Sequence, residues 1–168
     1  MFLTLVVFAS ACSGGRDEPN SAEGKKLASD SQRSVTESYW KLYDSIGDTA
    51  TRSPAQGYFK RCDGDRDDSL IYIIESVLDP KVKSPEKMSR EHFTDAVANR
   101  LAHIDWHFKA SGGTRSASKD GISVEMLPST INDRTVAFHV QSKCIDLGAV
   151  AKEIESNSSR VTVRRNAQ

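Results

Sequence analysis

The sequence has no apolar run long enough to cross a membrane, because a spanning helix needs ~20 apolar residues. It also has no net charge, with 23 basic and 23 acidic side chains. Nucleic-acid-binding proteins carry a basic excess, so this balance argues against that class. No Gly-x-Ser-x-Gly elbow, P-loop or dinucleotide fingerprint is present. We therefore expect no enzymatic activity, no cofactor and no nucleic-acid partner. An enzyme whose active site has no local motif stays open as an alternative.

The opening stretch, MFLTLVVFASAC, is typical of an export signal. Its apolar run Phe2–Ala9 has the length of a signal-peptide core, and small residues follow it up to Cys12. This order resembles the lipobox of bacterial lipoproteins, in which a diacylglycerol is attached to the cysteine thiol and the chain is cut just before it. The resemblance implies that Cys12 becomes a lipidated, palmitate-bearing N-terminus. It would hold the protein to the cell membrane on the extracytoplasmic side.

Two features depart from the lipobox pattern. Ala9 stands where a larger aliphatic residue is more usual, and no Lys or Arg precedes the run, although a signal begins with positive charge. The second departure indicates a start codon assigned too far downstream, so that the signal peptide is truncated at its beginning. The alternatives are an ordinary secreted protein with an incidental Cys12, or the start of a buried helix.

The cysteine count agrees with export. Three cysteines are present, and if Cys12 takes lipid, Cys62 and Cys144 are left. Outside the cytoplasm two thiols in one small domain usually form a disulfide. This bridge would close a loop of about 80 residues and stabilise the fold by ~4 kcal/mol on the chain-entropy model. Two buried reduced thiols are the alternative.

Hydrophobic periodicity divides the rest of the chain into helices and strands. The first predicted helix runs from the capping box Ser29–Gln32 to Gly47, and strands over 57–62 and 69–78 follow, joined by a DGDRDD hairpin. A second helix starts at Ser84-Pro85-Glu86. Strands over 103–109, 121–127 and 134–144 come next, and a short helix follows Asp146. Residues 49–56 and 111–121 are predicted as loops. The segment 103–109 alternates as a strand does, but a continuing helix would also place its apolar residues on one side.

This order predicts an α+β fold: an antiparallel sheet of about five strands packed on one side by two main helices, in two layers, plus a short C-terminal helix. The chain divides into a signal peptide (1–11), a lipidated cysteine with a flexible tether (12–28), a single globular domain (29–155) and a polar basic tail (156–168).

The same features resemble a known group of proteins. A lipobox cysteine, a Ser/Gly tether, an amphipathic helix, a YFKRC strand, a helix running into IDWHF and two hairpin strands ending SKCIDLG are similar to small lipoproteins of actinobacteria, including the LppA-like group. The resemblance covers about residues 9–150. It rests on the order of elements and on cysteine placement, so it implies a location and a fold and adds no site.

Candidate metal ligands are few. His103, Asp105 and His107 would share one face of a strand, and imidazole with carboxylate can bind zinc. The DGDRDD turn matches the first acidic positions of a calcium loop but has Asp68 where the loop needs Gly and Ile74 where it needs Glu. Solvated surface residues are the commoner explanation for both patterns. We therefore predict no metal site, with the first group as a weak candidate.

The sequence favours a non-enzymatic, lipid-anchored protein of the cell envelope that acts as an interaction module. Its partner would be the membrane, through the lipid on Cys12, and an unknown envelope protein that contacts the polar sheet face or the exposed loops. The alternative is a carrier or sensor that holds a small ligand in a pocket. A group of aromatic residues could line such a pocket or belong to the core: Tyr39, Trp40, Tyr43, Trp106 and Phe138.

Overall fold

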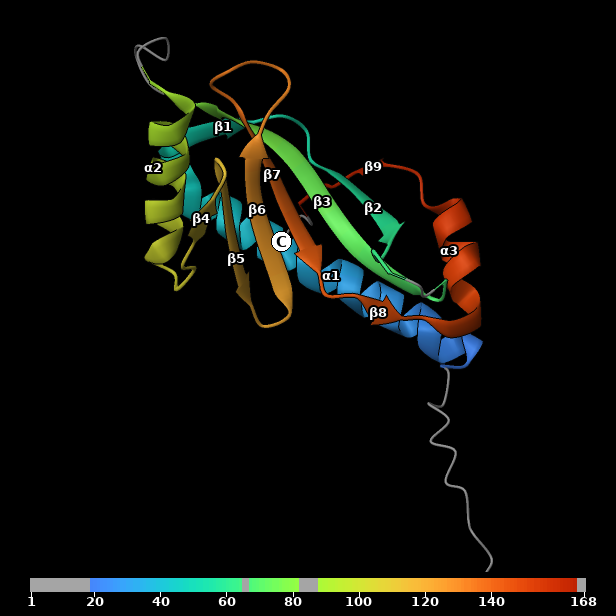
Figure 1. Cartoon of the computed structure of the whole chain (residues 1–168). Coiled ribbons are helices and arrows are strands. Elements are labelled where there is room, and N and C mark those ends of the chain that lie inside the picture. Colours follow the sequence, from blue (N-terminus) through green and yellow to red (C-terminus); the bar gives the residue numbers. More distant parts are fainter. Residues whose placement is uncertain (1–18, 65–66, 82–87, 166–168) are drawn as a thin grey trace, which may run out of the picture.

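The computed structural model describes residues 19–64, 67–81 and 88–165. The helices are α1 (Ser21–Ile46), α2 (Arg90–Ala102) and α3 (Ala151–Asn157), with 3-10 turns at Gly47–Thr49 and Gly148–Val150. The strands (Figure 1) are β1 (Ala50–Arg52), β2 (Gln56–Arg61), β3 (Ser69–Pro80), β4 (Lys109–Ser111), β5 (Thr114–Lys119), β6 (Ile122–Pro128), β7 (Val136–Ser142), β8 (Ile145–Asp146) and β9 (Val161–Thr162).

All nine strands of the described residues belong to one antiparallel sheet. Its order is β4-β5-β6-β7-β3-β2-β9, and β1 and β8 pair with the two ends of β3. The long apolar strand β3 is therefore central, as its sequence predicts. The predicted α+β class with an antiparallel sheet is confirmed. The sheet is larger than the predicted five strands because strands of two or three residues give too short a pattern to recognise.

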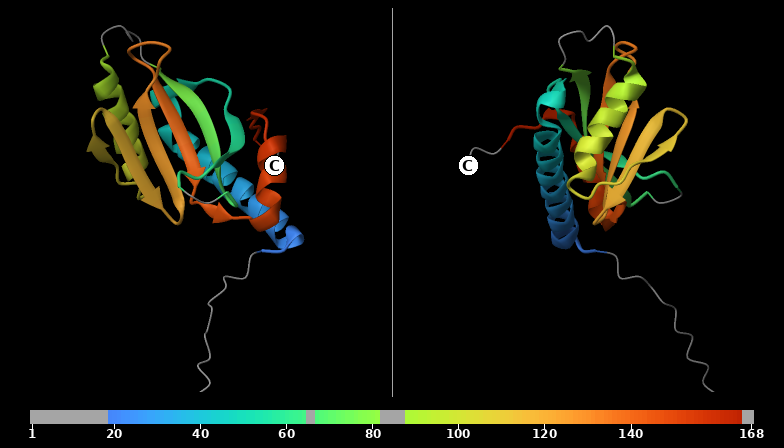
Figure 2. Two further views of the ribbon diagram at one scale, coloured as in Figure 1. Left: turned by 45° about the vertical axis from the view of Figure 1, so that its right-hand side comes forward. Right: turned by 90° about the vertical axis from the view of Figure 1, so that its left-hand side faces the viewer.

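The molecule has two layers. Figure 1 looks onto the open face of the sheet, with α1 behind it, and the right-hand view of Figure 2 shows the helix layer on one side and the strands on the other. Alternate residues of β3, β6 and β7 point into the helix layer and are buried, and the residues between them lie on the open face. One face of the sheet is thus left without a covering element among the described residues.

The core lies between the helices and the sheet. Tyr39 of α1 is fully buried, and its hydroxyl donates a hydrogen bond of 2.9 Å to Ser76 Oγ of β3. Phe93, Val97 and Leu101 form the apolar face of α2 and are also fully buried, as their spacing predicts. Both main helices therefore reach the same core.

α1 begins earlier than the capping box predicts. Asn20 is the N-cap, and its side-chain oxygen accepts hydrogen bonds from the backbone N–H groups of Ala22 and Glu23, both at 3.1 Å. The helix start predicted at Ser29 is therefore wrong, and residues 21–28 are helical rather than part of a tether. They stay in the domain because Ala28 packs against Leu70 and Leu147 in a second, smaller cluster.

α2 and the segment after it also differ from the prediction. The predicted start Ser84-Pro85-Glu86 lies outside the described residues, and the described helix begins at Arg90, where Ser89 caps it. The strand predicted over 103–109 is wrong. The N–H of Trp106 bonds back to the carbonyl of Leu101, and Asp105 has a positive φ of 63°, so the chain turns here. Apolar and polar residues can alternate over a few positions of a turn as they do in a strand, so the alternation alone could not identify a strand here.

The predicted loop over 111–121 is a pair of hairpins. Gly112 and Gly113 have φ of 54° and 84°, and Asp120 and Gly121 have φ of 52° and 77°. Two successive residues at positive φ join antiparallel strands tightly. β5 lies between these turns, and its polar sequence TRSASK hid it from the hydrophobic pattern. The loop predicted over 49–56 likewise contains β1.

The C-terminal tail is partly folded onto the domain, contrary to the predicted boundary at 155. α3 continues to Asn157, β9 pairs with β2, and the N–H of Val163 donates to the carbonyl of Ala55 at 2.9 Å. Arg160 forms an ion pair with Glu75 of the central strand. The tail therefore borders the open face and the end of α1.

The predicted disulfide is confirmed. Cys62 follows β2 and Cys144 lies between β7 and β8, and their Cα atoms are 5.9 Å apart. The bond joins the β2–β3 hairpin to the end of the β6–β7 meander. Residues separated by 82 positions are tied at one end of the sheet.

Candidate functional site

A row of polar side chains crosses the open face of the sheet. In the strand register Glu75 of β3 lies opposite Gln56 of β2 on one side and His139 of β7 on the other, and His139 lies opposite Glu125 of β6. Directly opposite residues have Cβ atoms about 5 Å apart. A histidine is thus flanked by two carboxylates in the middle of an uncovered sheet face.

Glu75 is fixed by two neighbours. The Tyr58 hydroxyl donates to one carboxylate oxygen at 3.1 Å, and Arg160 forms an ion pair with the other. The Arg160 guanidinium also lies over the Tyr58 ring, 4.7 Å from its centre. Burial and the neighbouring Glu75 carboxylate raise the pKa of Tyr58. Tyr58 therefore stays a neutral hydrogen-bond donor at physiological pH.

A groove of about 530 Å³ opens next to this row. Its polar end is formed by Gln56, Glu75 and His139, and its other end lies below the loop between β6 and β7. The apolar part of the lining consists of Pro54, Val77, Leu127, Pro128, Ile131 and Ala137. The volume is within the range of ligand-binding clefts, and the mixed lining suits a ligand with an apolar and a hydrogen-bonding part.

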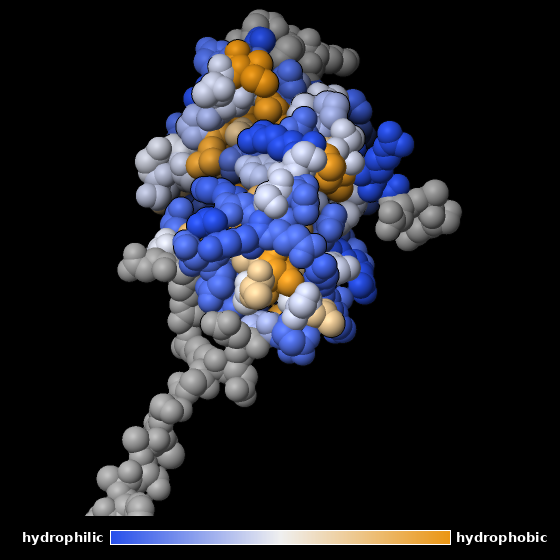
Figure 3. All heavy atoms as spheres, turned by 90° about the vertical axis from the view of Figure 1, so that its right-hand side faces the viewer, coloured by the Kyte–Doolittle hydropathy of each residue, from blue (hydrophilic) through white to orange (hydrophobic). Residues whose placement is uncertain are grey.

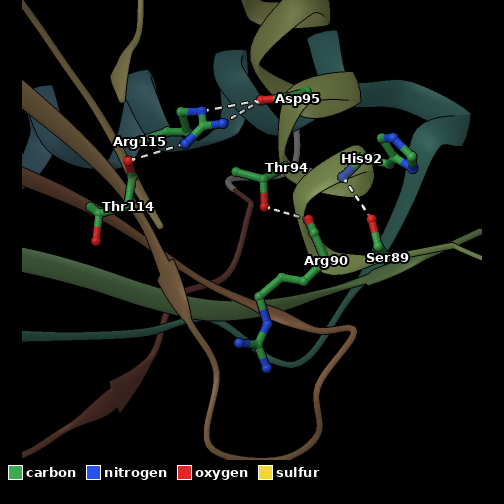
Figure 4. Close-up of polar contacts among 7 residues, drawn as sticks. All are labelled: Ser89, Arg90, His92, Thr94, Asp95, Thr114 and Arg115. Carbon is green, nitrogen blue, oxygen red and sulfur yellow. Dashed lines mark hydrogen bonds and ion pairs between the residues drawn. The ribbon is translucent and has the colours of Figure 1, made fainter. Parts of the chain in front are cut away.

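The loop above the groove is held rigidly. Asn132 Oδ1 accepts hydrogen bonds from the backbone N–H groups of Arg134 and Thr135, each at 2.9 Å. Arg90 of α2 donates to the Asn132 carbonyl at 2.9 Å, and Figure 4 shows its side chain extending from the helix toward this loop. The loop presents Ile131 with 68% of its surface exposed, which is unusual for a large apolar side chain.

The same close-up shows why α2 is a firm support. Arg115 of β5 donates two hydrogen bonds to Asp95 of α2, at 3.1 and 2.8 Å (Figure 4). Both bonds end on Asp95 Oδ1, and the Arg115 side chain is only 15% exposed, so the arginine side of this ion pair is better shielded than in an ordinary surface pair. α2 is therefore joined to the sheet near its middle, through Asp95, and to the groove loop at its first residue, Arg90.

The metal candidates are not brought together. His103 is the C-cap of α2, Asp105 lies in the turn after it, and His107 follows, so the three do not share a strand face. Asp67 of the DGDRDD turn forms an ion pair with Arg61, while residues 65–66 lie outside the described part of the chain. Within the described ranges no three His, Cys, Asp or Glu side chains are placed to hold a metal ion.

The predicted aromatic group is divided between core and surface. Tyr39, Trp106 and Phe138 are buried in the core between helices and sheet. Trp40 and Tyr43 are only partly buried and border a second hollow at the end of α1. The aromatic residues therefore do not line one enclosed ligand pocket.

Sequence reasoning anticipated a polar sheet face but missed the groove. The alternation of β6 and β7 placed His139 and Glu125 on the open face. The groove is bordered by the loop between β6 and β7 and by Ser53 and Pro54, which follow β1, and no periodicity marks either segment. An apolar Ile131 within an otherwise polar turn was the available signal.

Comparison of the chain with protein-family models, curated proteins and solved structures finds no match. In the part of the chain that the structure describes, no helix combines the length and apolar character that a membrane span requires.

Proposed function

We propose that this protein is a lipid-anchored, non-enzymatic interaction module of the cell envelope, and that it contacts its partner through the groove on the open sheet face. The observation that carries the proposal is the groove itself, with the exposed Ile131 at its rim and the Glu75–His139–Glu125 row beside it. The side chains between the helices and the sheet form a buried core, and the groove lies on the opposite, open face of the sheet.

The location rests on two features. The Cys62–Cys144 disulfide is typical of proteins outside the cytoplasm. The order of apolar run, small residues and Cys12 is that of a lipobox, although Cys12 lies outside the described residues. Lipobox processing attaches at least two acyl chains, and two chains are what stable anchoring needs.

The groove favours an extended protein segment as the partner. An apolar side chain of that segment would pack against Leu127, Ala137 and Ile131, and a neighbouring cationic or hydrogen-bonding group would face Glu125 and His139. Glu125 forms no ion pair within the described residues, so its charge is free to be complemented.

A small-ligand carrier or sensor is the second candidate. The volume of about 530 Å³ supports it, because clefts of this size hold drug-sized molecules. The groove is open along the sheet face, however, and an open groove buries less of a small ligand than an enclosed pocket does. We therefore rank the protein partner first.

The anchor is tested on the protein expressed in its own envelope. Mass spectrometry of the N-terminal peptide should find a diacylglycerol on Cys12, and the Cys12→Ala variant should leave the membrane fraction. A variant that stays membrane-bound would contradict the anchor.

The groove is tested by filling it. Ala137→Arg places a long cation in the groove floor and should abolish partner binding, whereas Ser34→Arg, on an exposed position of α1, should not. Equal binding by both variants would contradict the groove as the contact surface.

A further inference from the structure

A second hollow lies at the C-terminal end of α1, separate from the groove. It has a volume of about 750 Å³ and is formed by three segments far apart in the sequence: the end of α1, strand β1 and the chain after β9. Its charged lining residues are Arg52, Arg164, Arg165 and Asp44. Three guanidinium groups face one carboxylate, so the hollow carries an excess of positive charge in a chain whose net charge is zero.

Aromatic rings hold two of these arginines in place. The Arg52 guanidinium lies 4.5 Å from the centre of the Trp40 ring and 4.9 Å from that of Tyr43. The Arg165 guanidinium lies 5.0 Å from the Trp40 ring. Both guanidinium groups therefore contact the Trp40 ring, and cation–π attraction helps to hold them in place. Fixed guanidinium groups lose little side-chain entropy when a ligand binds.

The charges of these arginines are only partly balanced. Asp44 forms an ion pair with Arg165. Arg52 donates to the backbone carbonyl of Ser53 at 3.1 Å, and among the described residues neither it nor Arg164 forms an ion pair. Two guanidinium groups close to one ring repel each other, and an anion bound within reach of both would offset that repulsion.

β9, whose Thr162 lines the hollow, lies on a side of the molecule that is largely polar, with separate hydrophobic patches (Figure 3). Planar guanidinium groups match the oxygens of phosphate and carboxylate and bind them with paired hydrogen bonds.

We propose that the hollow lined by Trp40, Arg52, Arg164 and Arg165 is an anion-binding site for a phosphoryl group. The same chemistry occurs in free phosphate compounds and in the headgroups of anionic lipids. The site does not depend on the groove, and Asp44 competes with the ligand for Arg165.

Trp40 reports on the site directly. The sequence has two tryptophans, so Trp106→Phe leaves Trp40 as the only one. The full-length protein with this substitution is titrated with inorganic phosphate at constant ionic strength, with chloride as the control anion. A second titration uses phosphatidylcholine vesicles with and without phosphatidylglycerol. We expect a saturable change in Trp40 fluorescence with one of the two phosphoryl probes.

The proposal predicts the direction in which each substitution changes the affinity for the anion. Arg165→Gln and Arg164→Gln should each weaken binding by roughly tenfold, because each removes a charge-assisted hydrogen bond to the anion. Asp44→Asn should strengthen binding, since it removes the competing carboxylate. Arg100→Gln, at an exposed arginine of α2 that lines neither the groove nor this hollow, is the matched control and should change nothing.

Each outcome of these titrations supports or overturns the proposal. A response to phosphate supports a site for free phosphate compounds, and a response to phosphatidylglycerol vesicles alone supports a site for lipid headgroups. No saturable response to either probe would overturn the proposal. Equal weakening by Arg100→Gln, or weaker binding by Asp44→Asn, would also overturn it, because either result shows a general charge effect.

Discussion

At the scale of single residues, close packing gives the sharpest expectations. Gly24 lies in the first turns of α1, where alanine would ordinarily stabilise a helix by about 1 kcal/mol. A Cβ there would lie 2.5 Å from the Leu147 carbonyl oxygen and 2.6 Å from Val150 Cγ2. Overpacking of this kind costs roughly 1–3 kcal/mol, so we predict that Gly24→Ala lowers the free energy of unfolding by about 1 kcal/mol.

Urea denaturation measures this change, and Ser34→Ala is its control on the same helix. Ser34 is exposed, so alanine there should leave the free energy of unfolding unchanged or raise it by a few tenths of a kcal/mol. Stabilisation by both substitutions would show that residues 21–28 do not pack against the 147–150 turn.

Tyr39 gives a prediction about alkaline pH. Burial raises the pKa of its phenol, while its hydrogen bond to Ser76 acts in the opposite direction. The folded state therefore holds the proton more tightly than the unfolded state, whose pKa is ~10. The stabilisation from Tyr39 is complete below pH ~10 and is lost as the pH rises through the higher folded pKa.

The measurement is the free energy of unfolding from about pH 8 to about pH 11, for the native protein and for Tyr39→Phe. The variant should start less stable and lose less on the alkaline side. Identical losses would mean that ionisation of Tyr39 does not oppose the fold. Burial also raises the pKa values of Tyr58 and Tyr72, so some alkaline loss remains in the variant.

At the scale of elements, long periodic segments could be predicted and short or polar ones could not. α1, β3, β6 and β7 have repeating apolar positions because each buries a whole face. β1, β4, β5 and β9 are held mainly by backbone pairing with a neighbouring strand, which leaves little trace in their own sequences. The groove is lined by two segments without periodicity, Ser53–Pro54 and the loop between β6 and β7, so only its polar row could be foreseen.

Variants of Asp105 test whether this segment is a strand, as the sequence predicts, or the turn that follows α2. A non-glycine residue at a φ of 63° is strained by roughly 1 kcal/mol, so Asp105→Gly should raise the free energy of unfolding by up to about that amount. Asp105→Val should lower it, because a β-branched residue fits this region poorly. The ion pair from Lys119, at 3.8 Å and exposed, contributes little.

Thermal denaturation checks both variants, with Asp133→Gly as the control. Asp133 is exposed and has no positive φ, so glycine there should not stabilise the protein. If Asp105→Gly destabilises as much as Asp133→Gly does, the left-handed turn is absent and the strand prediction returns.

At the scale of the whole molecule, the proposed lipid anchor at Cys12 would limit how far the domain stands from the membrane. α1 begins at Ser21, so the chain between it and Cys12 is residues 13–20. Eight residues span at most about 28 Å when fully extended. A domain anchored at Cys12 would thus stay within about 30 Å of the membrane. The longer tether predicted from the sequence, which reaches residue 28, would allow a greater distance.

The disulfide should be a large part of the stability. Replacing Cys62 and Cys144 together by serine frees a loop with a separation of 82 residues and should lower the free energy of unfolding by about 4 kcal/mol. The free energy of unfolding is measured by urea denaturation, with and without reductant, for the native protein and for the double variant. Reductant should bring the native protein to the value of the variant and leave the variant unchanged. A loss below about 1 kcal/mol would contradict the account.

The measurement that tests the central claim most directly is photo-crosslinking from Ile131 in the native envelope. A photoreactive residue at Ile131, at the rim of the groove, should crosslink one recurrent envelope protein. The yield should fall when Ala137→Arg fills the groove, and the same photoreactive residue at Ser34 should not capture that protein. No recurrent partner from Ile131, or a partner captured equally from Ser34 and unaffected by Ala137→Arg, would contradict an interaction module that acts through the open sheet face.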